Sequence, residues 1–310
     1  MAEGRHQHGH QGHGHQDHGH QSHGHGGHDS THLDWVAMIP HLERNAEVYA
    51  PLYTQAMEWL RGTRPGGTGV IVDVGSGPGV VSCQLAAEFP QARVVAADPE
   101  EGLLARAAER AAREGLAERV STLRVELPHA MDELPAADLM WAARSLHHVG
   151  DQRAAIAALA GRLAPGGTLA LIEGGLPWRC LPRDFGMGRA GLQTRMDVLE
   201  EDWFADMRAS VPDSKPDTED WAELLTDAGL VRPASRTFLL DLPAPLDPRA
   251  RELVVELWRR RRDTLPESVS AQDAAVLDRL LDPEDPQSLH RRKDLFLLTA
   301  HTVHTAVKEG

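Results

Sequence analysis

Residues 73–81 have the sequence Asp-Val-Gly-Ser-Gly-Pro-Gly-Val-Val and directly follow the apolar run Val-Ile-Val at residues 70–72. A β-branched run that ends in three alternating glycines is typical of a buried parallel strand followed by a tight loop. Glycine has no Cβ, so such a loop lets the backbone approach a bound molecule closely. The helix expected next, residues 80–88, would direct its N-terminal N–H groups at the same molecule. The stretch therefore predicts a ligand-binding turn after the first strand.

The sixth position of this glycine pattern separates two kinds of nucleotide-binding loop. A dinucleotide fingerprint requires glycine at the sixth position of G-x-G-x-x-G, where this chain has Val80. The remaining pattern, D-x-G-x-G-x-G, resembles motif I of the class I S-adenosylmethionine (SAM)-dependent methyltransferases. The resemblance implies that the cofactor is bound by Asp73, Gly75, Ser76, Gly77 and Gly79.

Further segments between residues 69 and 175 resemble the same family and occur in its order. Asp98 and Pro99 end the second expected strand, residues 93–97. A carboxylate has two acceptor oxygens and can accept both hydroxyls of a ribose, so Asp98 and Pro99 are assigned to the cofactor site. Glu126 follows the third expected strand, where the family usually has an acidic residue near the adenine amino group. Asp132 is an alternative for that role.

The segment after the fourth expected strand, residues 138–142, contains Arg144-Ser145-Leu-His147-His148. It resembles the family's strand-four segment that ends in Leu-His-His. Histidine can act as a general base at neutral pH, which makes His147 and His148 candidate catalytic residues. The alternative is that they pack the loop behind the cofactor. Arg144 is assigned to the cofactor site, and contact of Arg144 and Ser145 with substrate is the alternative.

The alternation of apolar strands and helices predicts a doubly wound, mostly parallel α/β sheet of the class I methyltransferase type, with ligands at the carboxyl ends of its strands. Residues 33–66 are expected to form N-terminal cap helices, broken near Pro51. Residues 67–245 would form the SAM-binding core with a substrate-pocket insertion. Residues 246–310 would form a helical insertion and a closing strand, and a helix is the alternative for the last segment.

Residues 1–32 consist almost wholly of His, Gly, Gln, Asp and Ser. A segment without apolar side chains cannot bury a core, so we expect it to be a disordered tail. Its closely spaced histidines suit Zn, Ni or Cu(II), and we expect incidental metal binding there. A catalytic metal needs ligands held rigidly in a defined geometry, so no catalytic metal site is predicted.

The overall composition restricts the partners. The 310 residues carry a net charge of −14, from 32 basic and 46 acidic side chains, which disfavours nucleic acid as a partner. There is no signal-like N-terminus and no apolar run of about 18 residues. These features predict a cytoplasmic protein without a membrane partner. The four arginines at residues 259–262 lie among acidic residues and are expected to form a solvated, salt-paired helix face.

The combined features predict SAM-dependent O-, N- or C-methylation of a small-molecule acceptor in specialised metabolism. The protein would mainly align and desolvate the reactants of an SN2 displacement. One alternative is a regulatory or metal-handling protein that binds SAM or S-adenosylhomocysteine (SAH) without turnover. Another is an NAD(P) oxidoreductase, which Val80 disfavours. The acceptor, the methylated atom and the formation of a homodimer are left open.

Overall fold

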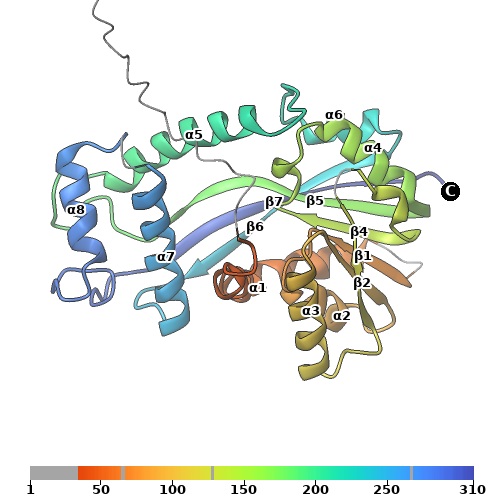
Figure 1. Cartoon of the computed structure of the whole chain (residues 1–310), viewed down its shortest axis with the longest axis horizontal. Helices are drawn as coiled ribbons and strands as arrows, with labels where there is room; N and C mark the ends of the chain where they lie inside the picture. Colours follow the sequence, from red (N-terminus) through yellow and green to blue (C-terminus); the bar gives the residue numbers. More distant parts are fainter. Residues whose placement is uncertain (1–33, 64–66, 127–128, 266–267) are drawn as a thin grey trace, which may run out of the picture. The chain divides into compact units, whose positions relative to one another are not determined.

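The computed structural model describes residues 34–63, 67–126, 129–265 and 268–310 (Figure 1). The predicted metal-binding tail, residues 1–32, lies outside these described residues. Within them, seven strands form one sheet in the order β3-β2-β1-β4-β5-β7-β6. The strands are β1 (Val70–Val74), β2 (Arg93–Asp98), β3 (Val120–Arg124), β4 (Ala137–Ala143), β5 (Leu163–Arg179), β6 (Val231–Leu242) and β7 (Leu297–Val307).

Strands β1 to β5 pair in parallel, and β7 lies antiparallel between β5 and β6. This topology confirms the predicted doubly wound, mostly parallel α/β fold. It also shows that the last segment is a strand and not a helix. Strand β7 is paired on both sides along most of its length, so its β-branched side chains are held in the extended conformation that suits them.

Helices cover both faces of the sheet because successive side chains of a strand point to opposite faces. Ile71 packs toward the face covered by α1 (Ile39–Gly62), α2 (Val80–Glu88) and α3 (Glu101–Arg113), whereas Val72 packs toward the other face. That other face is covered by α4 (Gln152–Arg162) and α6 (Trp221–Asp227). Burial on both faces explains why β1 is a continuous apolar run up to Asp73.

The predicted helix break near Pro51 is wrong. Helix α1 continues through Pro51, although proline lacks an N–H and costs several kcal/mol of helix stability in isolation. The apolar stripe of α1 is buried on both sides of the proline, at Val48, Leu52 and Ala56. This packing against the rest of the molecule holds the helix together, and it could not be deduced from local propensity.

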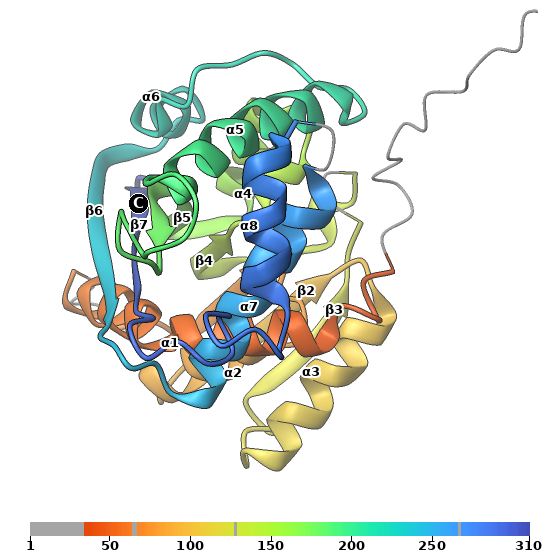
Figure 2. The ribbon, with the colours of Figure 1, turned by 90° about the vertical axis from the view of Figure 1, so that its left-hand side faces the viewer.

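Three further helices lie where β5 and β6 end and where β7 begins. They are α5 (Leu192–Ser210), α7 (Pro248–Thr264) and α8 (Ala271–Leu281). Figure 1 shows α7 and α8 next to each other at this end of the long strands, and Figure 2 shows them in front of the sheet. Strands β1, β2 and β4 run parallel to β5, so their carboxyl ends point toward the same side of the molecule. These helices therefore lie over the edge where ligands are expected.

The prediction of a solvated arginine face is wrong for one member of the run on α7. Arg262 pairs with Asp278 at 2.9 Å, but Arg261 is only 2% exposed. Its guanidinium contacts Asp197 at 2.8 Å and Glu200 at 2.5 Å, both on α5. It also lies over the Trp178 ring, 4.2 Å from the centroid. Helix α5 covers this side of α7, and only the tertiary structure shows that.

Replacing Arg261 by methionine is expected to lower the free energy of unfolding by about 2 kcal/mol, because the mostly buried Asp197 and the more exposed Glu200 each lose a partner. The loss stays below the usual range for a broken buried pair because Arg179 still pairs with Asp197, at 2.7 Å. Arg262→Met is the matched control, with an expected loss below about 1 kcal/mol. Urea denaturation measures the free energy of unfolding of both variants. Equal losses would contradict the burial of the Arg261 ion pairs.

Candidate active site

The glycine loop after β1 has the conformation that its sequence predicts. Gly75, Gly77 and Gly79 have φ values of 72°, 55° and 76°, a region that side chains disfavour. A Cβ on Gly75 would lie 2.8 Å from Ser145 Cβ, and one on Gly79 would lie 2.5 Å from Ala107 Cβ. A Cβ on Gly77 would meet no described atom within 4 Å. The first and third glycines therefore permit close packing, and the second faces open space.

Asp98 connects this loop to the end of β2. Its carboxylate is 6% exposed and accepts the Gly77 N–H at 2.9 Å on Oδ2 and the Glu100 N–H at 3.0 Å on Oδ1. Burial raises the pKa of Asp98, while the N–H groups of Glu100 and Gly77 oppose that shift. Pro99 follows it directly and is half-buried. Each carboxylate oxygen has a second lone pair with which it could bind a ligand hydroxyl.

Asp73 lies in β1 and is 2% exposed. Its Oδ2 accepts the Ser82 hydroxyl of α2 at 2.6 Å. Burial raises the pKa of Asp73 to about 7, although the Ser82 hydrogen bond lowers it. A carboxylate with this pKa changes charge near neutral pH, so a nearby cation would change its protonation state.

The backbone after β4 is also unusual. Arg144 has a φ of 53°, which costs energy in a residue with a side chain. Its N–H donates to Ile172 O of β5 at 3.0 Å. The buried Oγ of Ser145 has no hydrogen-bond partner among the described residues, and the same holds for Ser76 Oγ in the glycine loop. These two hydroxyls lie on the two loops that meet at Gly75.

The two candidate catalytic histidines end the short 3-10 helix η3 (Leu146–His148). His147 Nδ1 lies 3.5 Å from Glu173 Oε2, and the other oxygen of Glu173 accepts the Leu146 N–H at 3.1 Å. Arg208 of α5 donates to His147 O at 2.6 Å. Helix η3 is therefore fixed from β5 and from α5, and His147 is part of that attachment.

His148 has a different environment from its neighbour. The two imidazole rings are 4.1 Å apart, and the indole of Trp35 packs edge-on against His148 at 5.9 Å. The pKa of His148 is lowered to about 4, because solvent is partly excluded from its ring and because His147 and Arg260 add positive charge. His148 is therefore neutral at pH 7 and able to accept a proton.

Four buried aromatic side chains lie near these groups, and sequence analysis did not assign them to the site. Tyr49 and Tyr53 come from α1, Trp141 from β4 and His301 from β7. The Tyr49 and His301 rings stack at 5.0 Å, and Tyr53 lies 6.0 Å from Trp141 and 6.1 Å from His301. Trp141 Nε1 and His301 Nδ1 have no partner among the described residues. Burial, followed by the charge of Arg144, lowers the pKa of His301 to about 3.

The two acidic candidates for the adenine are not brought into contact with the rest of the site. Glu126 follows β3 and is exposed, and Asp132 is exposed in the short 3-10 helix η2 (Met131–Glu133). Neither carboxylate has a hydrogen bond or an ion pair within the described part of the chain.

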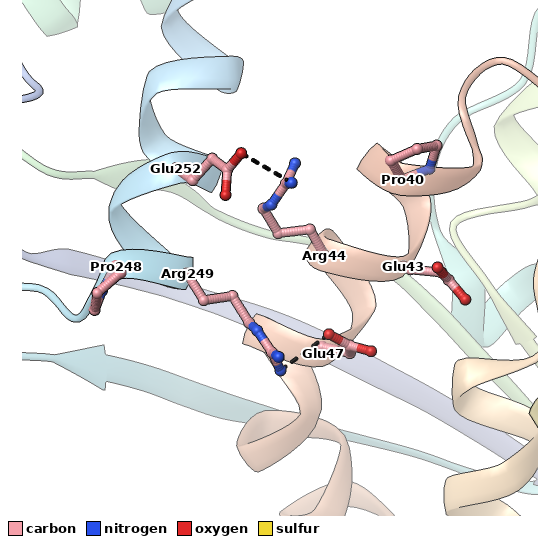
Figure 3. Close-up of a pocket in the computed structure, with 7 residues that line it drawn as sticks. All are labelled: Pro40, Glu43, Arg44, Glu47, Pro248, Arg249 and Glu252. Carbon is pink, nitrogen blue, oxygen red and sulfur yellow. Dashed lines mark ion pairs between the residues drawn. The ribbon is translucent and has the colours of Figure 1, made fainter. Parts of the chain in front are cut away.

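Two surface cavities lie away from this edge. One, of about 460 Å³, is bordered by α1 and α7 and is crossed by the ion pairs Arg44–Glu252 and Arg249–Glu47 (Figure 3). The other, of about 620 Å³, lies where β1 and β4 begin, beside Asp138. Across the described residues no group of three His, Cys, Asp or Glu side chains could hold a metal ion. No helix in that part of the chain is long and apolar enough to cross a membrane.

Comparison with known proteins identifies the kind of domain. Residues 72–169, which contain β1, the glycine loop, Asp98 and η3, match the family model of a methyltransferase domain. Residues 72–169 of this chain are a methyltransferase domain. This domain contains every candidate residue proposed from the sequence, whereas Tyr49, Tyr53 and His301 lie outside the matched segment.

Relatives share this domain but not the whole chain. An uncharacterized methyltransferase of Mycobacterium bovis is 35% identical over 109 residues, which are 35% of this chain and 52% of that protein. Trans-aconitate 2-methyltransferase of Variovorax paradoxus is 39% identical over 104 residues, 33% of this chain and 37% of that protein. The chain thus spans about half or less of the length of these relatives. An O-methyltransferase family structure from Burkholderia thailandensis aligns with a TM-score of 0.47 and 16% identity, covering 89% of this chain and 58% of that one.

Proposed function

We propose that this chain transfers a methyl group from SAM to a small-molecule acceptor at the carboxyl edge of the sheet. The observation that carries the proposal is the position of Asp98. Its carboxylate is fixed by the Gly77 and Glu100 N–H groups beside a loop whose central glycine faces open space. The matched methyltransferase domain covers this arrangement. One relative is named for trans-aconitate, which is a small molecule.

The donors and acceptors at this edge fit the parts of SAM. Asp98, with Pro99 beside it, would bind the ribose hydroxyls, and Gly75, Gly77 and Gly79 would let the backbone approach the cofactor. The hydroxyls of Ser76 and Ser145 are buried without a partner among the described residues, and a bound ligand would satisfy them. Asp73 would lie near the cationic amino group of the methionine part. Glu126, or Asp132 in its place, would contact the adenine.

The chain's own residues would mainly orient the reactants and exclude water. SAM supplies a methyl group on a positively charged sulfur. The acceptor atom forms a new bond to the methyl carbon, and the sulfur keeps the electron pair of the C–S bond that breaks. The rings of Tyr53, Trp141 and His301 form a buried aromatic surface. Such a surface keeps the site dry, and transfer that removes the sulfonium charge is favoured there.

The catalytic assignment of the two histidines stays a prediction. We propose His148 as the proton acceptor, because His147 is held by Glu173 whereas His148 is neutral at pH 7. For an acceptor atom that carries a proton, His148→Gln is expected to lower kcat about tenfold, less than the usual loss of about 100- to 10,000-fold for a general base, because a pKa of about 4 makes this imidazole a weak base at pH 7. His147→Gln is expected to lower thermal stability more than kcat. The reverse pattern would reject the assignment.

Calorimetric titration of the purified protein with SAM, SAH and NADH tests the proposal. Binding of SAM and SAH without binding of NADH would support it, and incubation with labelled SAM and a set of small acceptors would then be expected to release SAH. Binding of NADH alone would favour an oxidoreductase. A folded protein that binds neither sulfur nucleoside would contradict the proposal. Binding without turnover on any acceptor would favour a regulatory protein.

A further inference from the structure

Helix α7 lies antiparallel along the first half of α1. Polar side-chain contacts join the two helices turn by turn, with N···O distances of 3.0 Å for Arg249–Glu47, Arg44–Glu252 and His41–Glu256, and Arg44 also pairs with Glu256. Figure 3 shows the first two of these pairs. One helical turn toward the C-terminus of α7 therefore lies beside one turn toward the N-terminus of α1. This register also predicts where the next turn of α7 lies.

That next turn carries Arg260 beyond the start of α1. Arg260 is four residues after Glu256 and lies on the same face of α7, whereas α1 begins at Ile39. The chain just before α1 contains Trp35, whose ring contacts His148 of η3. Arg261, the residue after Arg260, is buried and pairs with Asp197 of α5, and this contact fixes the position of this turn of α7. Arg260 is thereby directed toward the carboxyl edge of β4, where Arg144 lies.

Arg144 reaches the same place from the sheet. Its strained backbone follows β4 directly, and the next residue, Ser145, packs against Gly75 of the glycine loop. Arg260 is exposed at the surface, but partial desolvation of its guanidinium lowers its pKa and the charge of Arg144 lowers it further, while the charge of Glu200 opposes both. The charge of Arg144 also lowers the pKa of His301. Arg144 is therefore close to the aromatic surface as well as to Arg260.

Neither guanidinium group forms an ion pair with a described carboxylate, although the charge of Glu200 acts on Arg260. No carboxylate among the described residues lies within 4.0 Å of Arg144 or Arg260, while Arg261 and Arg262, next along α7, are both paired. Arg208, which also lies at η3, donates to the carbonyl oxygens of His147 and Val149. Positive groups that approach one another without an anion between them repel. In a chain with a net charge of −14, such a group of cations requires an explanation.

We propose that the acceptor carries an oxyanion, a carboxylate or a phosphate, which Arg144 and Arg260 bind between them. The proposal rests on the proposed methyl transfer and specifies the substrate class of the same site. Guanidinium groups bind both oxyanions through paired N–H donors. An anion here would also balance the positive sulfonium of SAM. Anchored at Arg144, the rest of the acceptor would extend over Tyr53, Trp141 and His301.

The test titrates succinate, inorganic phosphate and uncharged succinamide into the SAH-loaded protein by calorimetry. At least one anion is expected to bind, and succinamide is not. Arg144→Asn and Arg260→Gln should each weaken anion binding at least tenfold. Asparagine is chosen at Arg144 because it tolerates a positive φ. Arg259→Gln removes an exposed neighbouring charge on the same helix and is expected to leave anion binding unchanged.

Each outcome is decisive, because SAH binding is measured first. SAH that binds while neither anion binds would overturn the inference and leave the proposed function intact. Equal loss of anion binding in Arg259→Gln would show a general charge effect and would also overturn it. Failure of SAH to bind the folded wild-type protein would overturn the proposed function itself. If Arg144→Asn lowers stability, the exposed Arg260→Gln variant still tests the inference. Tighter binding of succinate or of phosphate identifies the acceptor's anion.

Discussion

Asp98→Asn is expected to weaken SAM binding about 100-fold, which corresponds to about 3 kcal/mol for the hydrogen bonds between a carboxylate and two ribose hydroxyls. An asparagine side chain keeps one acceptor oxygen and turns an NH2 group toward a donor. In the loop, that NH2 would face the N–H of Gly77 or Glu100, both of which now donate to Asp98. Calorimetric titration with SAM measures the loss.

The matched control for this variant lies at the opposite edge of the sheet. Asp138 Oδ2 also accepts two backbone N–H groups, from Gly69 at 2.8 Å and from Val70 at 2.9 Å. Asp138→Asn should therefore lower stability to a similar extent without changing the affinity for SAM. A similar loss of affinity in both variants would mean that Asp98 acts through folding. Unchanged affinity in Asp98→Asn would remove it from the cofactor site.

The affinity for SAM is expected to rise with pH up to about pH 7 and then to level off. Burial raises the pKa of Asp73 to about 7, so the free protein holds a proton on Asp73 below that pH. The cationic amino group of SAM favours the ionised carboxylate, and binding then releases the proton. The dissociation constant should fall about tenfold per pH unit below pH 7. Titrations between pH 5.5 and pH 8.5, in steps of about half a unit, would measure this slope.

Two variants check that Asp73 causes this dependence. Asp73→Asn should abolish it and weaken binding at pH 8. Ser82→Ala removes the hydrogen bond that lowers the pKa of Asp73, so the curve should shift to higher pH. An unshifted curve in both variants would assign the proton to another group.

The raised pKa of Asp73 also predicts how the stability of the cofactor-free protein depends on pH. Folding raises the pKa of Asp73 from its ordinary value of 3.8 to about 7, so between these values the unfolded chain is ionised there while the folded chain is not. Folding then takes up a proton, and this contribution to stability falls as pH rises through that window. Asp73→Asn should therefore be more stable than the wild type at pH 8, while it binds SAM more weakly. Urea denaturation of both proteins at pH 8 measures the difference.

Sequence analysis predicted the conformation of the glycine loop because its determinants are local. The glycines at 75, 77 and 79 need positive φ values, and Asp98 ends a strand that is paired in parallel with β1. Strand ends and loop conformations follow from residues that are close in the chain. The order of strands and helices followed in the same way, and it predicted the sheet that the structure shows.

The tertiary structure alone showed which distant residues reach the carboxyl edge of the sheet. His301 is buried in the site because β7 inserts between β5 and β6, and Arg260 is directed there by the register of α7 along α1. Pro51 stays helical and Arg261 is buried because neighbouring helices cover them. Local propensity and charge pattern describe a residue's own segment. Burial, strand pairing and helix register depend on contacts between segments that are far apart in the chain. The free energies of these contacts are set by the tertiary structure and not by any one segment.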